Sequence, residues 1–373
     1  LVWTGHRRRD ASARDAARLG GTPWRRFIQI ELPALRPYLW TAFILVALLT
    51  SAEYAVPSLF RINTYPVVVL ARFAAYYDIR GAVTMAWPYV LLPALVLLVW
   101  QWRVAPDLIR TQAPQQPRHV PPSHAGWFLV LAIGFLLTAV LPVTVLVIRA
   151  GGAQTYISAW HTARGQLLTS LLLACIAATL LMVLGLLISM GIHRARGMSR
   201  QALEYLTLLP IALPGALFGI GLIALWNHPS TAGLYASVAI LPVLYAARCI
   251  PFAIRPQLIA LSQLGRNMLD AARLSTATPW ARFRHIALPV ILPSAAAAWA
   301  ICFALCFREL TGTLLIAPPG IETLAVRIYS LYHYGAGRLV AALALFMLIA
   351  NAGIVAATVA IIRIPQPCLK SNT

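Results

Sequence analysis

The sequence predicts an all-α integral membrane protein built from two related halves, and three observations support this prediction. Hydrophobic residues make up 60% of the 373 residues and charged residues only 11%, whereas a soluble domain carries about 25% charged residues. The mean hydropathy of +0.76 agrees with this composition. Apolar stretches of membrane-spanning length recur along the chain, and one polar motif occurs twice.

A helix that crosses a bilayer needs about 20 mostly apolar residues. Eight stretches of the sequence meet this length and composition. They lie near Leu35–Ala52, Thr84–Trp102, Gly126–Ile148, Gln166–Met190, Gln201–Trp226, Ala232–Phe252, Ile291–Phe307 and Leu339–Ile362. Between the second and third stretches, residues 103–125 form a polar linker rich in Pro and Gln, which marks the boundary between the two halves.

The net charge is +20, from 30 Lys and Arg against 10 Asp and Glu. Basic chains often bind nucleic acid, but these charges lie between apolar runs and form no basic soluble domain, so no nucleic-acid partner is expected. With the N-terminus inside and the spans alternating, the inside segments hold 22 basic residues and the outside segments 8. This split follows the positive-inside rule, and both termini are predicted to be cytoplasmic.

One motif occurs in two copies, from Asp15 to Pro33 and from Asp270 to Pro289. Each copy holds Asp-Ala-Ala-Arg-Leu, then Thr-Pro-Trp, Phe, Ile and Leu-Pro, and nine positions separate Trp from the final Pro in both. The similarity continues, because 20 positions separate this Pro from a glutamate in each copy, Glu53 and Glu309. A repeat of this length predicts two related halves.

The residues of the motif indicate its local structure. In both copies Thr-Pro begins a helix, because Thr caps its first turn and Pro takes a position that needs no N–H. Leu-Pro then ends the element where the chain enters the membrane. The motif therefore predicts a helix–turn–helix on the cytoplasmic face between two spans. A generic interfacial helix would explain the basic and aromatic residues, but not the same spacing twice.

This motif resembles the cytoplasmic coupling loop of type I ABC importer permeases, whose family form is Glu-Ala-Ala, three residues, Gly, nine residues, Ile, one residue and Leu-Pro. The second copy keeps this spacing, with Asp270 for Glu and Thr276 for Gly, and the first keeps Gly20 but is one residue shorter before Trp24. The resemblance implies that these two coupling segments bind an ABC ATPase dimer through Asp15, Ala16, Ala17, Gly20, Pro23, Trp24, Asp270, Ala271, Ala272, Arg273, Pro279 and Trp280.

The same resemblance implies a type I ABC importer permease fold and divides the chain. Residues 126–363 correspond to a complete second half of six helices, and residues 364–373 to a cytoplasmic tail. Residues 1–102 correspond to the C-terminal part of the first half, with a coupling segment and two helices. By repeat symmetry about four spans are missing upstream. Since the sequence does not begin with Met, we expect an N-terminally truncated form of a twelve-span fused permease.

The expected ligand comes from a narrower resemblance. Fused double permeases of this type include those for ferric iron and for thiamine. The stretch from Arg308 to Tyr329 resembles the ferric-iron type, and so do Leu209-Pro210 and Leu213-Pro214-Gly215. We therefore expect ferric iron to be the ligand, with thiamine or another small solute as the alternative.

Four residues are candidates for the translocation path. Glu53 and Glu309 occupy equivalent positions at the outer end of the span after each coupling segment. Ionisable residues at membrane depth are costly and often functional, so both could line the path or meet the binding protein. A local pair of Glu309 with Arg308 is the alternative. Pro210 and Pro214 are expected to kink a span that lines the path.

Two local clusters are interpreted as packing rather than as metal sites. Cys302 and Cys306 share a helical face, but no His or second Cys pair completes a site. The aromatic cluster of Tyr332, His333 and Tyr334 lies in a predicted outer loop, where such groups usually pack. Neither a metal nor a cofactor bound by this chain is therefore expected.

The sequence shows no catalytic constellation. A P-loop needs Gly-Lys followed by Ser or Thr, and the only lysine, Lys370, follows Leu369. We therefore expect the ATPase subunit to use the ATP. The resemblance further implies a periplasmic solute-binding protein as partner and the bacterial inner membrane, with its lipid, as the location. The alternatives from other classes are a membrane-embedded enzyme acting on lipid and a non-functional permease remnant.

Overall fold

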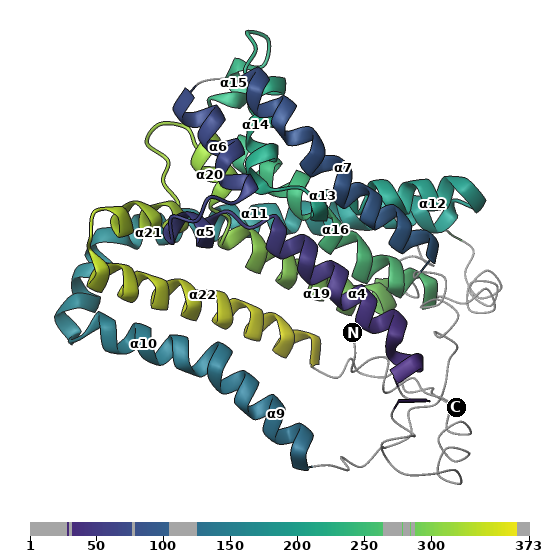
Figure 1. Ribbon diagram of the computed structural model, residues 1–373, viewed down its shortest axis with the longest axis horizontal. Coiled ribbons are helices and arrows are strands. Elements are labelled where there is room, and N and C mark those ends of the chain that lie inside the picture. The colour runs from purple at the N-terminus through teal and green to yellow at the C-terminus, as the bar shows by residue number, and fades with distance from the viewer. Residues whose placement is uncertain are drawn as a thin grey trace. The chain divides into compact units, whose positions relative to one another are not determined.

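The computed structural model describes residues 28–29, 32–76, 79–103, 125–263, 278, 284 and 288–363. These residues belong to two compact units, residues 1–135 with 212–214 and residues 136–211 with 215–373. The first unit holds five helices in its described part, labelled in Figure 1: α4 Leu32–Ser51, α5 Ala55–Leu59, α6 Tyr65–Tyr76, α7 Ile79–Arg103 and α9 Ala125–Phe135.

Side-chain contacts join the helices of the first unit. The Trp100 indole of α7 donates a hydrogen bond to the Thr41 hydroxyl of α4 over 2.9 Å. On α6, Tyr65 stacks on Tyr89 of α7 with ring centroids 5.4 Å apart. Such polar and aromatic contacts hold helices together where lipid supplies no hydrophobic driving force between them.

The second unit begins with a π-helical turn and continues through a longer series of helices. Its described elements are η2 Leu136–Val140, α10 Leu141–Ala150, α11 Ala153–Arg194, α12 Gly197–Leu206, α13 Leu209–Ala212, α14 Gly215–Trp226, α15 Ala232–Tyr235, α16 Ile240–Gln263, α19 Leu288–Phe307, α20 Thr311–Ile316, α21 Leu324–His333 and α22 Gly337–Arg363.

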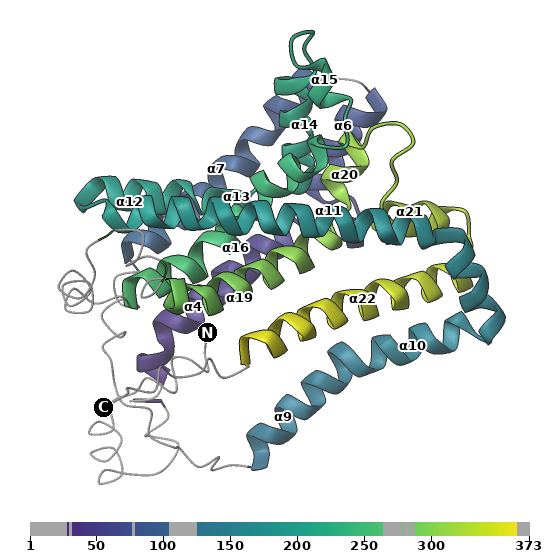
Figure 2. The same ribbon diagram turned by 180° about the vertical axis from the view of Figure 1, so that it is seen from behind.

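The core of the second unit lies between α11, α16 and α19, which run side by side in both views (Figures 1 and 2). Small residues bring α11 and α16 into close contact, because a Cβ on Gly185 would lie 2.8 Å from the Cβ of Ala253. On either side of this crossing, Ser189 donates to the Ile254 carbonyl over 3.1 Å and Gln257 donates to the Met182 carbonyl over 3.1 Å. Small residues with flanking polar contacts are typical of membrane helix interfaces.

Three of the eight predicted spans need correction. The stretch Ala232–Phe252 is not one helix: α15 ends at Tyr235, and α16 begins at Ile240 after a turn in which Ser237 bonds the Leu234 carbonyl over 2.8 Å. The stretch Gln201–Trp226 is bent by 106° between Ala212 and Gly215. The predicted span Gln166–Met190 was too short, because the helix that contains it, α11, has 42 residues and extends beyond it at both ends.

The two halves show the same order of elements around the candidate glutamates. After α4 comes Glu53, followed by the short α5 and then α6 and α7. After α19 comes Glu309, followed by the short α20 and then α21 and α22. This correspondence agrees with the repeat seen in the sequence.

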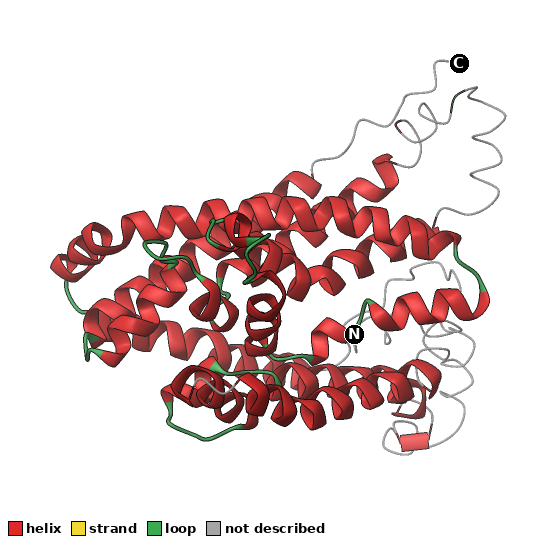
Figure 3. Cartoon of the chain, turned by 90° about the horizontal axis from the view of Figure 1, so that it is seen from above, coloured by secondary structure: helices red, strands yellow, loops and turns green. Residues whose placement is uncertain are grey.

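The predicted all-α membrane fold is confirmed. Every regular element in the described ranges is a helix, and no strand occurs there (Figure 3). Five of these helices are long and apolar enough to cross a membrane, and the bent pair makes a sixth if it counts as one span. The five are residues 83–103, 129–150, 153–194, 288–307 and 337–362.

Candidate functional site

The coupling segments lie outside the described residues, apart from single positions such as Thr278. Their twelve predicted ATPase-contacting residues, from Asp15 to Trp24 and from Asp270 to Trp280, therefore remain predictions. The flanking helices do fix where the second segment attaches, because α16 ends at Gln263 and α19 begins at Leu288. The second coupling segment thus joins two helices of the packed core.

Glu309 forms an ion pair with Arg248 of α16, and not the local pair with Arg308 that the sequence left open. The Glu309 side chain is only 7% exposed, whereas that of Arg248 is 26% exposed. The second carboxylate oxygen of Glu309, Oε1, accepts a hydrogen bond from the backbone N–H of Gly312 over 3.0 Å. The carboxylate is therefore held by a guanidinium from one element and by the first turn of α20.

The beginning of α14 packs directly against this ion pair. A Cβ on Gly215 would lie 2.6 Å from Nη1 of Arg248 and 3.1 Å from Oε1 of Glu309. Only a residue without a side chain leaves the guanidinium and the carboxylate where they are. Gly215 is also the first residue of α14, immediately after the 106° bend.

Further contacts fasten α20 to α16 beside the ion pair. Thr313 donates to the Glu309 carbonyl over 3.1 Å and shares a 3.0 Å hydrogen bond with the Tyr245 hydroxyl. A Cβ on Gly312 would lie 2.7 Å from Cδ2 of Leu244, a fully buried side chain. The start of α14, the middle of α16 and α20 therefore meet in one closely packed cluster around two opposite charges.

Glu53 occupies the matching place in the first unit with a simpler environment. One of its carboxylate oxygens accepts a hydrogen bond from the backbone N–H of Ala55 over 3.0 Å, at the start of α5. Both glutamates thus contact the first turn of the short helix that follows a span, where a negative charge is favourable. A role of Glu53 or Glu309 in translocation is a proposal taken up below.

Pro210 and Pro214 flank the bend in the chain, as the sequence predicted. Pro210 lies in α13, and Pro214 immediately precedes α14. Proline removes a backbone donor and disfavours helix at the residue before it, which accounts for the break between Ala212 and Gly215.

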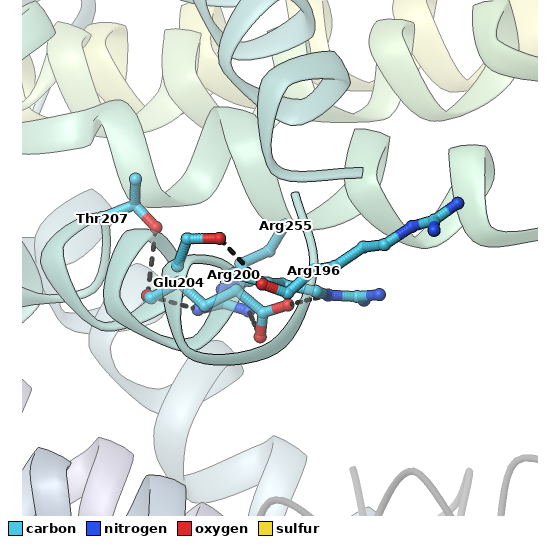
Figure 4. A network of polar contacts seen from close by, with 6 residues as sticks. Arg196, Arg200, Glu204, Thr207 and Arg255 are labelled. Carbon is cyan, nitrogen blue, oxygen red and sulfur yellow. Dashed lines mark hydrogen bonds and ion pairs between the residues drawn. The ribbon is translucent and has the colours of Figure 1, made fainter. Parts of the chain in front are cut away.

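A second polar network connects α12 to α16 (Figure 4). Glu204 accepts a hydrogen bond from Nε of Arg200 over 2.8 Å, and its other carboxylate oxygen lies 3.6 Å from Nη1 of Arg255. Arg255 also donates to the Glu204 carbonyl over 2.9 Å, and Thr207 donates to the same carbonyl over 3.1 Å. Since Arg255 lies seven residues after Arg248, α16 carries two ion-paired arginines two turns apart on one face.

We expect Glu204→Gln to loosen α12 from α16. The change leaves the Arg255 side chain, 30% exposed, without its opposite charge, and an ion pair at such a partly exposed site contributes up to about 1 kcal/mol. The midpoint of thermal unfolding should fall by about 2–4 °C. Arg200→Gln is the matched control, because the exposed i,i+4 pair contributes only about 0.3–0.5 kcal/mol. Equal shifts for both variants would contradict this assignment.

The structure describes the surroundings of the cysteine cluster and of the aromatic cluster that the sequence assigned to packing. Cys302 and Cys306 are buried between α19 and α16, where the Cys302 thiol points to the Cys249 carbonyl at 4.0 Å. His333 packs on Tyr329 with ring centroids 4.4 Å apart, while Tyr334 is exposed. Across the described ranges, no group of three or more His, Cys, Asp or Glu is placed to hold a metal ion. The sequence did not predict that Cys249 lies beside Cys302, because the two residues are 53 positions apart along the chain.

The helices, the break at the prolines and the ion pair together define a class of protein. Several apolar helices of membrane-spanning length, one span broken at prolines, and an ion pair beside that break are features of multi-pass membrane transport proteins.

Comparison with known proteins finds a family match for part of the chain. Residues 181–363, just under half of the chain, match the family described as the binding-protein-dependent transport system inner membrane component, and the chain is similar to permeases of ABC importers. The fold agrees with the structure of a bacterial ABC transporter involved in the import of alginate, an acidic polysaccharide. The TM-score is 0.53, the sequences are 17% identical, and the match covers 64% of this chain and 94% of that chain.

Curated relatives belong to several transport systems. FbpB 2 of Haemophilus influenzae, an Fe(3+)-transport system permease protein, is 23% identical over 83% of this chain and 63% of its own length. PotC of Escherichia coli K12, a spermidine/putrescine permease, is 26% identical over 52% of this chain and 72% of its own. PhnV of Salmonella typhimurium, assigned to 2-aminoethylphosphonate transport, is 24% identical over 58% of this chain and 86% of its own. The relatives are transport permease components.

Proposed function

We propose that this chain is the membrane-spanning subunit of an ATP-driven importer in the bacterial inner membrane. It receives a solute from a periplasmic binding protein and passes it to the cytoplasm, while a separate ATPase dimer hydrolyses ATP. The observation that supports this most strongly is the family match of residues 181–363, which covers the α16–α19 pair and the coupling segment between them. A related alginate transporter has been solved with a ligand-bound periplasmic protein, which supports the second partner.

We further propose that both termini are cytoplasmic and that the outer ends of α4 and α19 face the periplasm. The distribution of basic residues supports this orientation, because Arg248 and Arg255 lie within α16 but the other 20 residues counted as inside still outnumber the 8 outside. In this orientation Glu53 and Glu309 lie toward the periplasmic side of the translocation path, and the break at Pro210 and Pro214 lines it. The burial of a charge pair beside a broken helix supports a place on the path, since such features mark transport routes.

Ferric iron is the ligand that we propose first. FbpB 2 is the relative that covers the largest share of this chain among those described above, and the stretch from Arg308 to Tyr329 resembles the ferric-iron type. The names of PotC and PhnV show that permeases of similar sequence serve other solutes. Thiamine and another small solute stay as alternatives.

The experiment that tests the proposal is purification of the full-length protein with candidate ATPase and binding-protein subunits, followed by measurement of ATP hydrolysis in nanodiscs. We expect an ATPase dimer to be retained, and hydrolysis to rise when binding protein loaded with ferric iron is added. Loaded binding proteins for thiamine, spermidine and 2-aminoethylphosphonate serve as comparisons. If the ATPase dimer is retained but ATP hydrolysis does not rise with the iron-loaded binding protein, ferric iron is rejected as the ligand and the importer function still holds.

Failure to retain any ATPase would overturn the importer proposal and favour an alternative from another class. A permease remnant would fold without retaining an ATPase, and upstream DNA would lack an in-frame segment encoding further spans. A membrane enzyme would turn over lipid without either partner. These outcomes separate the three functions by direct measurement.

A further inference from the structure

We propose that the Arg248–Glu309 ion pair is a gating contact, which is closed in this structure and must open for a solute to pass. The proposal rests on the permease function proposed above. It assigns a role to Arg248, which the sequence did not select, and makes Arg248 and Gly215 positioning residues for transport. We call this contact the gating pair.

The gating pair holds three elements of the second unit together. Arg248 belongs to α16, Glu309 follows α19, and Gly215 at the start of α14 leaves no space for a methyl group against either charge. The half-helix that follows the 106° bend is therefore packed against the pair itself. Any movement of α14 away from α16 and α20 changes the surroundings of both charges.

The two charges of the gating pair lie far along α16 and α19 from the coupling segment. This segment joins the C-terminal end of α16 to the N-terminal end of α19. Arg248 precedes Gln263 at the end of α16 by 15 residues, about 22 Å along the helix axis. Glu309 comes two residues after Phe307, the last residue of α19, and so lies at the far end of that helix. A displacement applied at the coupling segment would shift α16 relative to α19. The gating pair connects α16 to the residue after α19 at a point far from that segment, so the shift would change the contact between the two charges.

The gating pair can open without leaving the buried carboxylate unpaired. When Arg248 leaves, Glu309 keeps its hydrogen bond from the Gly312 N–H at 3.0 Å. The Arg248 side chain is already 26% exposed and can exchange the carboxylate for water. A buried charge that loses every partner is strongly unfavourable, but the Glu309 carboxylate keeps one backbone donor.

Native cysteines beside the pair can report its opening. Cys249 follows Arg248 directly, the backbone carbonyl of Cys306 accepts the Glu309 N–H at 3.1 Å, and both cysteines are at most 4% exposed. Cys175 lies on α11 and serves as an internal control for general loosening. With Cys368 replaced by Ser, the full chain in nanodiscs is treated with N-ethylmaleimide, and labelling of each cysteine is followed by mass spectrometry.

We expect Glu309→Gln to speed labelling of Cys249 and Cys306 about tenfold while Cys175 stays at its wild-type rate. Gly215→Ala should act in the same direction without removing a charge, because the new methyl group displaces the Arg248 guanidinium. Glu322→Gln is the matched control. It removes a carboxylate just before α21 that lies 3.7 Å from Arg327 and 3.2 Å from Gln166 and contacts neither member of the gating pair, and should leave all three rates unchanged.

The proposal is overturned if both variants leave Cys249 and Cys306 at the wild-type rate, or if Cys175 accelerates equally, which would show a merely structural role. A second measurement uses the wild-type chain with its ATPase, trapped with ATP and vanadate. Faster labelling of Cys249 in the trapped complex supports gating, and an unchanged rate contradicts it. Retention of the ATPase is scored in the same sample, so failure of gating is distinguishable from failure of the importer function.

Discussion

A chain that carries arginine in place of both Asp15 and Asp270 should no longer retain its ATPase subunits during purification. Each aspartate opens one copy of the repeated motif, near the predicted start of a short helix, where a negative charge is favourable and could meet a partner arginine. Reversal of both charges replaces attraction by repulsion at two docking sites at once. We expect the retained ATPase to fall at least about tenfold, which corresponds to 1.4 kcal/mol of binding free energy.

A variant with Asp10→Arg and Asp107→Arg is the charge-matched control. Both aspartates lie in segments predicted to be cytoplasmic, but neither belongs to the repeated motif. This control should retain the ATPase at the wild-type level. If the Asp15 and Asp270 variant also retains it, the coupling segments are not the docking sites. If both variants lose it, overall charge rather than the motif governs the association.

Replacement of Gly185 by leucine should disrupt the core of the second unit. Its Cβ would lie 2.8 Å from the Ala253 Cβ and 3.0 Å from the Ala253 backbone carbon, and a backbone atom cannot rotate away. Overpacking costs about 1–3 kcal/mol, and separation of α11 from α16 would also strain the Ser189 and Gln257 hydrogen bonds. A loss of 3 kcal/mol lowers the midpoint of thermal unfolding by about 6–12 °C.

Gly191→Leu on the same helix provides the control for this prediction. No atom lies within 4 Å of a Cβ at Gly191, so the added side chain meets open space and should change stability by less than about 0.5 kcal/mol. Thermal unfolding of both variants in the same nanodiscs gives the comparison. Similar midpoints for Gly185→Leu and wild type would show that α11 and α16 pack less closely than described.

The sequence predicted the long helices well where the information is local. The stretch Ile291–Phe307 became α19, Leu288–Phe307, and Leu339–Ile362 became α22, Gly337–Arg363, because hydropathy depends only on residues within one span. The prolines at 210 and 214 likewise mark a break by their own chemistry. The fold class and the family resemblance followed from such local patterns together with the repeat.

The sequence could not predict contacts between distant positions. The gating pair joins residues 61 positions apart, and Arg255 meets Glu204 over 51 positions. For this reason the predicted span Ala232–Phe252 ended too early, before α16 reached Gln263. A charged residue such as Arg255 indicates the end of an apolar stretch when the residue that neutralises it, Glu204, is not known to be near. The coupling segments stay predictions, since they lie outside the described residues.

The unequal lengths of the packed helices determine how the protein responds to bilayer thickness. α11 has 42 residues and measures about 63 Å, but its apolar stretch from Leu167 to Met190 measures about 36 Å. This stretch is longer than the hydrocarbon thickness of about 30 Å, so α11 can match thicker membranes by reducing its tilt. α19 has 20 residues and about 30 Å, with no length to spare. In lipids with longer acyl chains, the hydrophobic mismatch therefore falls on α19, and tilting or local thinning must compensate. Arg308 and Glu309, which directly follow its last residue Phe307, are the first charged groups beyond that end to be affected by the mismatch.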